Sequence, residues 1–93
     1  MKYYASYSAN NNPSYIRKPY EYTSMVKAIN DIMSIVHNIH VSQPYNCSDY
    51  LVWDENNTII AKGGLRNEGK WYIDDDATGT KIDDIEWFLF HKF

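Results

Sequence analysis

The stretch TSMVKAINDIMSIVH, from Thr23 to His37, decides the fold, because it carries the clearest helical pattern in the chain. Its apolar side chains recur at intervals of three and four residues, which is the period of a helix with one buried face. Thr23 or Ser24 can cap its first turn, and Asn38 can end it, because asparagine tolerates the left-handed conformation. The apolar stripe consists of Met25, Ile29, Ile32, Met33 and Val36, with Val26 on its flank.

Strand patterns lie on both sides of this helix. Residues 2–8 alternate between two faces, and residues 49–53 are apolar on both faces, which predicts a strand near the middle of a sheet. The polar turn 54–57 joins residues 49–53 to residues 58–62 as a hairpin, which we expect Gly63 and Gly64 to end. Residues 70–74 form the next strand.

This order of elements predicts an α+β fold over residues 1–93, as a single domain. We expect a two-layer structure, an antiparallel sheet of about four to five strands with one main helix, Thr23–His37, packed across one face. The segment Ile82–Phe93 is open between a strand and a helix, because its apolar residues fit both periods. Residues 14–22 form a loop or a short extended arm.

The composition limits the classes of protein. A chain of 93 residues has room for one modest core, and its single cysteine, Cys47, excludes an internal disulfide framework and a cysteine-rich zinc site. The chain has no run of 18 apolar residues and no pattern of a signal peptide at its start. We therefore expect a cytoplasmic protein, in a bacterial or host cell, that does not bind membranes.

Charge is distributed unevenly along the chain, although the net charge is only −3. Residues 1–47 hold four basic and two acidic side chains, whereas residues 48–93 hold five basic and ten acidic ones. Such asymmetry indicates a charged partner. Six of the acids gather in one segment; they are Asp74, Asp75, Asp76, Asp83, Asp84 and Glu86.

No motif for catalysis, metal or cofactor binding is evident. His37 and His40 lack a third ligand nearby, and the sequence around Cys47 matches no cysteine-nucleophile signature. The oxygens of residues 74–80 suit a hard cation, but their spacing is not that of an EF-hand loop, so ion binding there stays open. We expect no cofactor and predict that the protein is not an enzyme.

A basic and aromatic arm covers residues 14–22. Arg17 and Lys18 stand among Tyr15, Tyr20 and Tyr22, a mixture similar to that of proteins that bind single-stranded nucleic acid. Two cations are too few for useful affinity, which normally takes several phosphate contacts. Direct nucleic-acid binding through this arm is therefore not the favoured function.

The favoured hypothesis is a small inhibitor that docks on a larger, basic, nucleic-acid-handling protein. Its acids would occupy sites made for phosphates, and aromatic side chains would anchor the contact. Anti-CRISPR and anti-restriction proteins of phages and mobile elements are similar in type, although no motif here matches one of their families. The alternatives are a self-associating accessory domain, which would form a homodimer, and a weak nucleic-acid binder. The predicted partner-binding residues are Asp74, Asp75, Asp76, Asp83, Asp84, Glu86, Tyr15, Arg17 and Tyr20.

Overall fold

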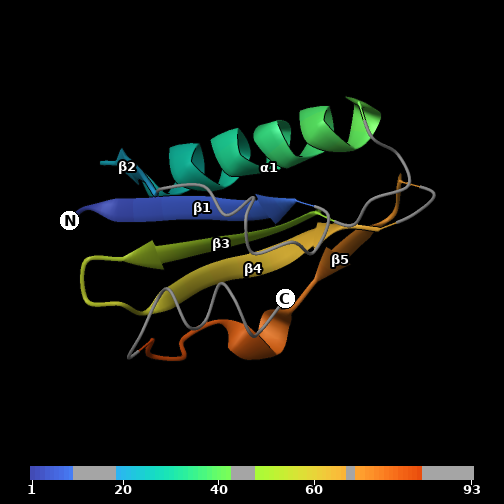
Figure 1. The fold of residues 1–93 in the computed structure, drawn as a ribbon. Helices are drawn as coiled ribbons and strands as arrows, with labels where there is room; N and C mark the ends of the chain where they lie inside the picture. The colour runs from blue at the N-terminus through green and yellow to red at the C-terminus, as the bar shows by residue number, and fades with distance from the viewer. Residues whose placement is uncertain (10–18, 43–47, 67–68, 83–93) are drawn as a thin grey trace.

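The computed structural model describes residues 1–9, 19–42, 48–66 and 69–82, and within them it contains one antiparallel sheet and one α-helix (Figure 1). The strands have the order β2-β1-β3-β4-β5, and α1 lies across one face, so the predicted α+β fold is confirmed. The elements are β1 (Tyr3–Ala9), β2 (Tyr20–Tyr22), α1 (Met25–Ser42), β3 (Ser48–Asp54), β4 (Ile59–Leu65), β5 (Trp71–Ile73) and the 3₁₀ turn η3 (Asp75–Ala77).

The middle strand, β3, is buried along its whole length, as its two apolar faces predict. On the side that we call the helix face, its side chains pack under α1. On the opposite side, the far face, they meet the segment that follows β5. The helix-face core comprises Ala5, Ala28, Ile32, Val36, Tyr50, Val52 and Leu65. The far-face core comprises Leu51, Trp53, Ile59 and Ile82, with Tyr4 and Ala77 packed against it.

The helix begins close to the predicted position but runs further than predicted. Ser24 is the capping residue: its Oγ accepts the N–H of Lys27 at 3.3 Å. The predicted end at Asn38 is wrong, because α1 continues to Ser42. The additional turn buries His40 and extends a stripe with a spacing of four residues, which explains why the helix does not stop at Asn38. That stripe consists of Ala28, Ile32, Val36 and His40.

The start of the predicted stripe is also corrected. Met25 is 42% exposed and Val26 is 62% exposed, so the first turn of α1 contributes little to the core. Ile29 and Met33 are half-buried at its margin. Because the buried stripe begins at Ala28, the helix approaches the sheet through a small side chain.

The hairpin between β3 and β4 forms as predicted, and one carboxylate organises its turn. Asp54 Oδ1 accepts the N–H groups of Asn56 at 2.9 Å and of Thr58 at 3.0 Å. Asn57 adopts a φ of 60°, a left-handed conformation that asparagine tolerates better than most residues. The free N–H groups and the left-handed conformation of the turn therefore favour aspartate and asparagine at these positions.

The predicted role of Gly63 and Gly64 as the end of the strand is wrong, because β4 continues through both to Leu65. Both positions require glycine, because atoms of the neighbouring strands occupy the space that a Cβ would need. A Cβ on Gly63 would meet the backbone oxygen of Tyr72 and lie 2.8 Å from the Tyr50 hydroxyl. A Cβ on Gly64 would lie 2.7 Å from Asp49 Oδ1 and would meet the backbone of β3. The missing side chains leave room for the side chains of β3 on both faces.

Two sequence expectations fall outside the described residues. The choice between strand and helix for Ile82–Phe93 is one, since only Ile82 of that segment is described, and it is buried. The other is most of the arm at residues 14–22, of which residues 20–22 form β2. In the described part of the chain, no helix is long and apolar enough to cross a membrane.

The packing over Gly63 predicts that Gly63→Ala lowers the free energy of unfolding by about 1–3 kcal/mol, because the added methyl group must displace backbone and the Tyr50 ring. Urea unfolding measures the change. Asn30→Ala, at an exposed position of α1, is the control and should leave stability unchanged or slightly higher. An unchanged unfolding midpoint for Gly63→Ala would contradict the described packing.

Candidate functional site

Three of the six acids in the predicted segment lie in the described part of the chain, and they divide into one inward and two outward side chains. Asp74 Oδ2 lies 3.4 Å from Lys62 Nζ, and the Asp74 N–H donates to the Lys62 carbonyl at 2.9 Å. Its side chain is largely buried, so Asp74 helps to hold β5 on β4. Asp75 and Asp76, in η3, are both exposed.

The backbone on both sides fixes the position of η3. Beyond the turn, the Gly79 N–H donates to the Ile59 carbonyl at 2.8 Å, and the Ile59 N–H donates to the Thr80 carbonyl at 2.9 Å. Ala77 packs against the far-face core. The carboxylates of Asp75 and Asp76 therefore project from a short turn that is held at both ends.

The other predicted contact residues have different outcomes. Tyr20 lies in β2 and is half-buried against the helix-face core, so its ring contributes to packing. Asp83, Asp84, Glu86, Tyr15 and Arg17 lie outside the described residues. Their proposed roles stay predictions.

The three side chains of β5 are exposed, and none of them is among the predicted partner-binding residues. Trp71 and Tyr72 are each 39% exposed, and Ile73 is 52% exposed. We call these three residues, together with Asp75 and Asp76, the β5–η3 surface. The one signal available in the sequence is an apolar strand directly before an acidic turn. That signal does not reveal that β5 lies at the edge of the sheet.

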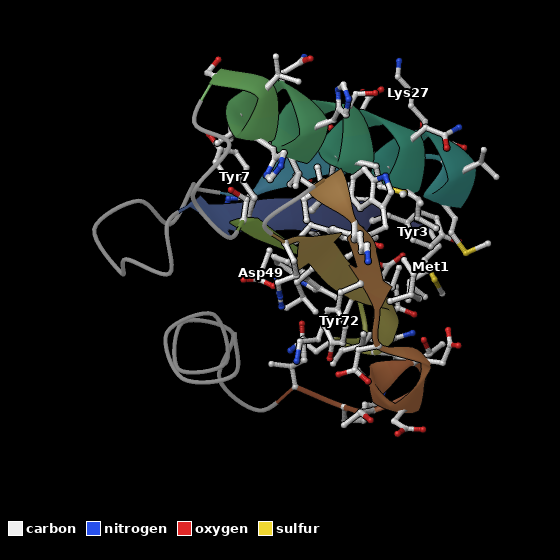
Figure 2. All side chains as sticks on the ribbon, turned by 90° about the vertical axis from the view of Figure 1, so that its right-hand side faces the viewer. Met1, Tyr3, Tyr7, Lys27, Asp49 and Tyr72 are labelled. Carbon is white, nitrogen blue, oxygen red and sulfur yellow. The ribbon has the colours of Figure 1, made fainter. Side chains whose placement is uncertain are left out.

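An ion pair between a buried carboxylate and a partly exposed guanidinium supports this surface from the far face, the side of the sheet that carries Asp49 and Tyr72 in Figure 2. Arg66 Nη2 lies 2.8 Å from Asp49 Oδ1, and the guanidinium lies 4.9 Å from the centre of the Tyr72 ring. This arrangement is typical of a cation–π contact. The pair therefore links the centre of the sheet to the exposed ring of Tyr72.

Burial raises the pKa of the Asp49 carboxyl, while its bond to Arg66 and the charges of Arg66 and Lys62 oppose that rise. Asp49 Oδ2 is buried and has no hydrogen-bond partner among the residues that the structure describes, which agrees with the dominance of desolvation. The pKa of Tyr72 is also raised, by desolvation and by the charge and hydrogen bond of Asp74. Both groups thus favour their neutral forms more than they would in water.

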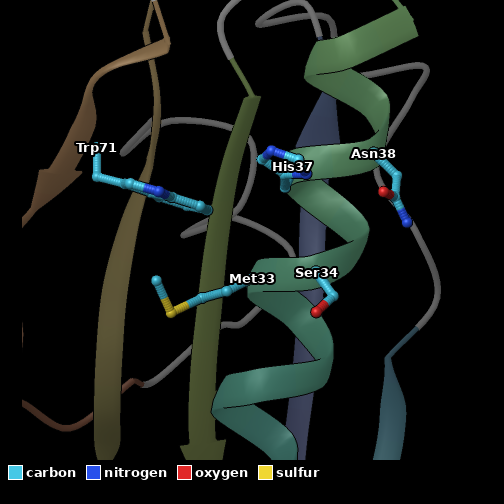
Figure 3. A pocket seen from close by; sticks show the side chains of 5 residues that line it. All are labelled: Met33, Ser34, His37, Asn38 and Trp71. Carbon is cyan, nitrogen blue, oxygen red and sulfur yellow. The ribbon is translucent and has the colours of Figure 1, made fainter.

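A shallow groove lies on the helix face between α1 and β5 (Figure 3). Its volume is about 390 Å³, and it is lined by Met33, Ser34, His37, Asn38 and Trp71. The Trp71 ring meets the Tyr50 ring edge to face, at 6.3 Å between centres. His37 opens onto this groove, whereas His40 is buried in the last turn of α1. Among the described residues, no three histidine, cysteine or acidic side chains gather as metal ligands.

Comparison with protein-family models, curated proteins and solved structures gives no match. Function is therefore inferred from the residues of this chain alone.

The raised pKa of Asp49 predicts a pH dependence of stability. The folded protein holds the Asp49 proton more tightly than the unfolded chain, so this group favours folding most below its ordinary pKa of 3.8. Its contribution falls as the pH rises from there through the raised pKa. The free energy of unfolding of wild type minus that of Asp49→Asn should therefore decrease over this range and then level off.

Urea unfolding at a series of pH values measures this difference. Asp76→Asn, at an exposed position, is the matched control. A difference for Asp49→Asn that grows with pH would show that the Arg66 pair outweighs burial.

Proposed function

We propose that this chain is a non-enzymatic binding protein that inhibits a larger nucleic-acid-handling protein by docking on its basic, phosphate-binding surface. The observation that carries the proposal is the β5–η3 surface, where two exposed carboxylates lie one residue beyond three exposed apolar side chains. We infer a partner from exposed carboxylates and exposed apolar side chains together, since exposed carboxylates by themselves are common on protein surfaces.

The carboxylates supply the electrostatic part of the contact. Asp75 and Asp76 are adjacent and exposed, and their charges can replace those of neighbouring phosphates in a basic cleft. Complementary charge speeds encounter and selects a basic partner over an acidic one. The half of the chain that contains η3 carries five basic and ten acidic side chains. Repulsion between its few cations and the cations of a basic partner is therefore small.

The apolar side chains supply the anchoring part. Tryptophan and tyrosine are enriched among the residues that dominate binding energy, because they bury much area with few rotatable bonds. Trp71 also lines the groove beside α1, which offers a partner side chain a place to insert (Figure 3).

The fixed backbone of η3 supports the same proposal. A loop that must be ordered on binding loses affinity through conformational entropy. The hydrogen bonds of Gly79 and Thr80 to Ile59 hold this turn before any partner arrives. Little ordering is then needed when the carboxylates meet cations.

The proposal predicts that Asp75→Lys with Asp76→Lys weakens capture of the partner by about a hundredfold or more, because like charges would then face each other. The immobilised chain is exposed to bacterial lysate at low salt, and bound proteins are identified by mass spectrometry. The specific result is a captured nucleic-acid-binding protein that added duplex DNA displaces.

The control is Glu21→Lys with Glu55→Lys, which makes the same change of charge at two exposed positions elsewhere. Both double variants must keep the wild-type circular dichroism spectrum. Capture that is indifferent to duplex DNA, or that the two double variants reduce equally, would contradict the proposal.

A further inference from the structure

Among the described residues, no strand lies beside β5 on the side opposite β4, and the hydrogen-bond register shows which groups of β5 point to that side. The Asp74 N–H donates to the Lys62 carbonyl at 2.9 Å, and the Arg66 N–H donates to the Lys70 carbonyl at 3.0 Å. These bonds flank the pairs Gly63↔Ile73 and Leu65↔Trp71, which makes both of them non-hydrogen-bonded pairs of an antiparallel ladder.

The N–H and C=O groups of Trp71 and Ile73 therefore point away from β4, while those of Tyr72 point toward it. None of the backbone hydrogen bonds described outside the regular ladders uses these outward groups. An edge of this kind is a template for a further strand.

We propose that this strand is provided by a second copy of the chain, through antiparallel pairing of β5 with β5 about a two-fold axis at Tyr72. The sequence from Lys70 to Asp74, KWYID, is complementary to itself in that register. Lys70 lies opposite Asp74 of the other copy, Trp71 lies opposite Ile73, and Tyr72 lies opposite Tyr72.

The outward backbone groups agree with this register. Trp71 of one copy and Ile73 of the other exchange both N–H···O=C bonds, and the symmetric pair does the same. Tyr72 then faces its equivalent as a non-hydrogen-bonded pair, in which side chains are closest. The two five-stranded sheets become one continuous antiparallel sheet.

Side chains match on both faces of the paired strands. On the helix face, the exposed Trp71 and Ile73 cover each other, an aromatic–aliphatic pair of the kind that stabilises sheets. On the far face, the two exposed Tyr72 rings meet at the axis. The pairing thus covers the three apolar side chains that β5 exposes.

Charge selects a second copy over an unrelated strand. The Lys70 ammonium is placed across from Asp74, which already has Lys62 Nζ at 3.4 Å, so the carboxylate lies between two cations. The symmetry repeats this contact on the other side of the axis. Opposite charges directly across an antiparallel pair are favourable, and like charges are not.

This inference and the proposed function share the apolar part of the β5–η3 surface, because the pairing covers Trp71, Tyr72 and Ile73. Dimerisation therefore competes with a partner for these three side chains, whereas Asp75 and Asp76 lie beyond the paired residues. A dimer would present two copies of the acidic turn. Failure of dimerisation is measured on the protein alone, whereas failure of partner docking is measured by capture.

The first test is the molar mass of the full chain by sedimentation equilibrium over a concentration series. The wild type should form a dimer, and Ile73→Pro should be monomeric, because proline removes an outward N–H. Proline is tolerated at an edge position whose N–H faces solvent, so the fold should be kept, as circular dichroism checks. A monomeric wild type, or a folded Ile73→Pro that dimerises equally well, overturns the proposal.

The register is tested by cross-linking in a Cys47→Ser background, where the introduced thiol is the only one. Tyr72→Cys should form a disulfide-linked dimer under mild oxidation, because a non-hydrogen-bonded pair brings the two Cα atoms within disulfide range. Lys70→Cys, on the same face but far from its equivalent, should not. Cross-linking of Lys70→Cys in preference to Tyr72→Cys overturns the register.

The charge match is tested by Lys70→Asp, which would place two carboxylates opposite each other on both sides of the axis. Dimerisation should weaken by about tenfold at low salt. Lys27→Asp makes the same change of charge on exposed α1 and should leave the dimer intact. Equal dimerisation constants for the two variants contradict the assigned role of Lys70.

Discussion

Burial of β3 on both faces is the constraint on which the rest of the structure depends. Val52 and Leu51 are neighbours on this strand, point to opposite sides of the sheet and are both fully buried. Each contributes about 1.5–3 kcal/mol only when its own side is covered. The helix covers one side, and the return of the chain to Ile82 contributes to covering the other. The two layers are thus coupled through one strand.

The sequence predicts the parts of this arrangement that local patterns encode. The strand that is apolar on both faces and the polar turn at Asp54 are visible within a few residues each, and both are confirmed. The helical period is confirmed as well, but the buried stripe starts at Ala28 and not at Met25. The course of β4 through Gly63 and Gly64 is different, because the reason for these glycines lies on neighbouring strands, in the Tyr50 ring and the Asp49–Arg66 pair. A short pattern cannot distinguish a glycine that turns the chain from one that makes room. The end of α1 was missed for a similar reason, since burial of His40 depends on the sheet.

The candidate site was predictable in its charge and not in its apolar part. Asp75 and Asp76 are exposed, as an acidic, glycine-containing loop suggests. The inward turn of Asp74 depends on Lys62, a residue of another strand, which no spacing along the chain reveals. Exposure of Trp71 follows from the position of β5 at the edge, so it required the strand order. Contacts between distant residues therefore decide which of the acidic and aromatic side chains face solvent.

The strand order also has a consequence for how the chain folds. β1 pairs along its full length with β3, although β2 and α1 separate them in the sequence. Pairing between distant segments carries the entropy of closing a long loop, which slows folding. The hairpin of β3 and β4 is local and has its turn organised by Asp54, so it is suited to form first and to serve as a template. During synthesis β1 emerges before β3 does. The tyrosines of β1 therefore stay without their full packing until the central strand has been made.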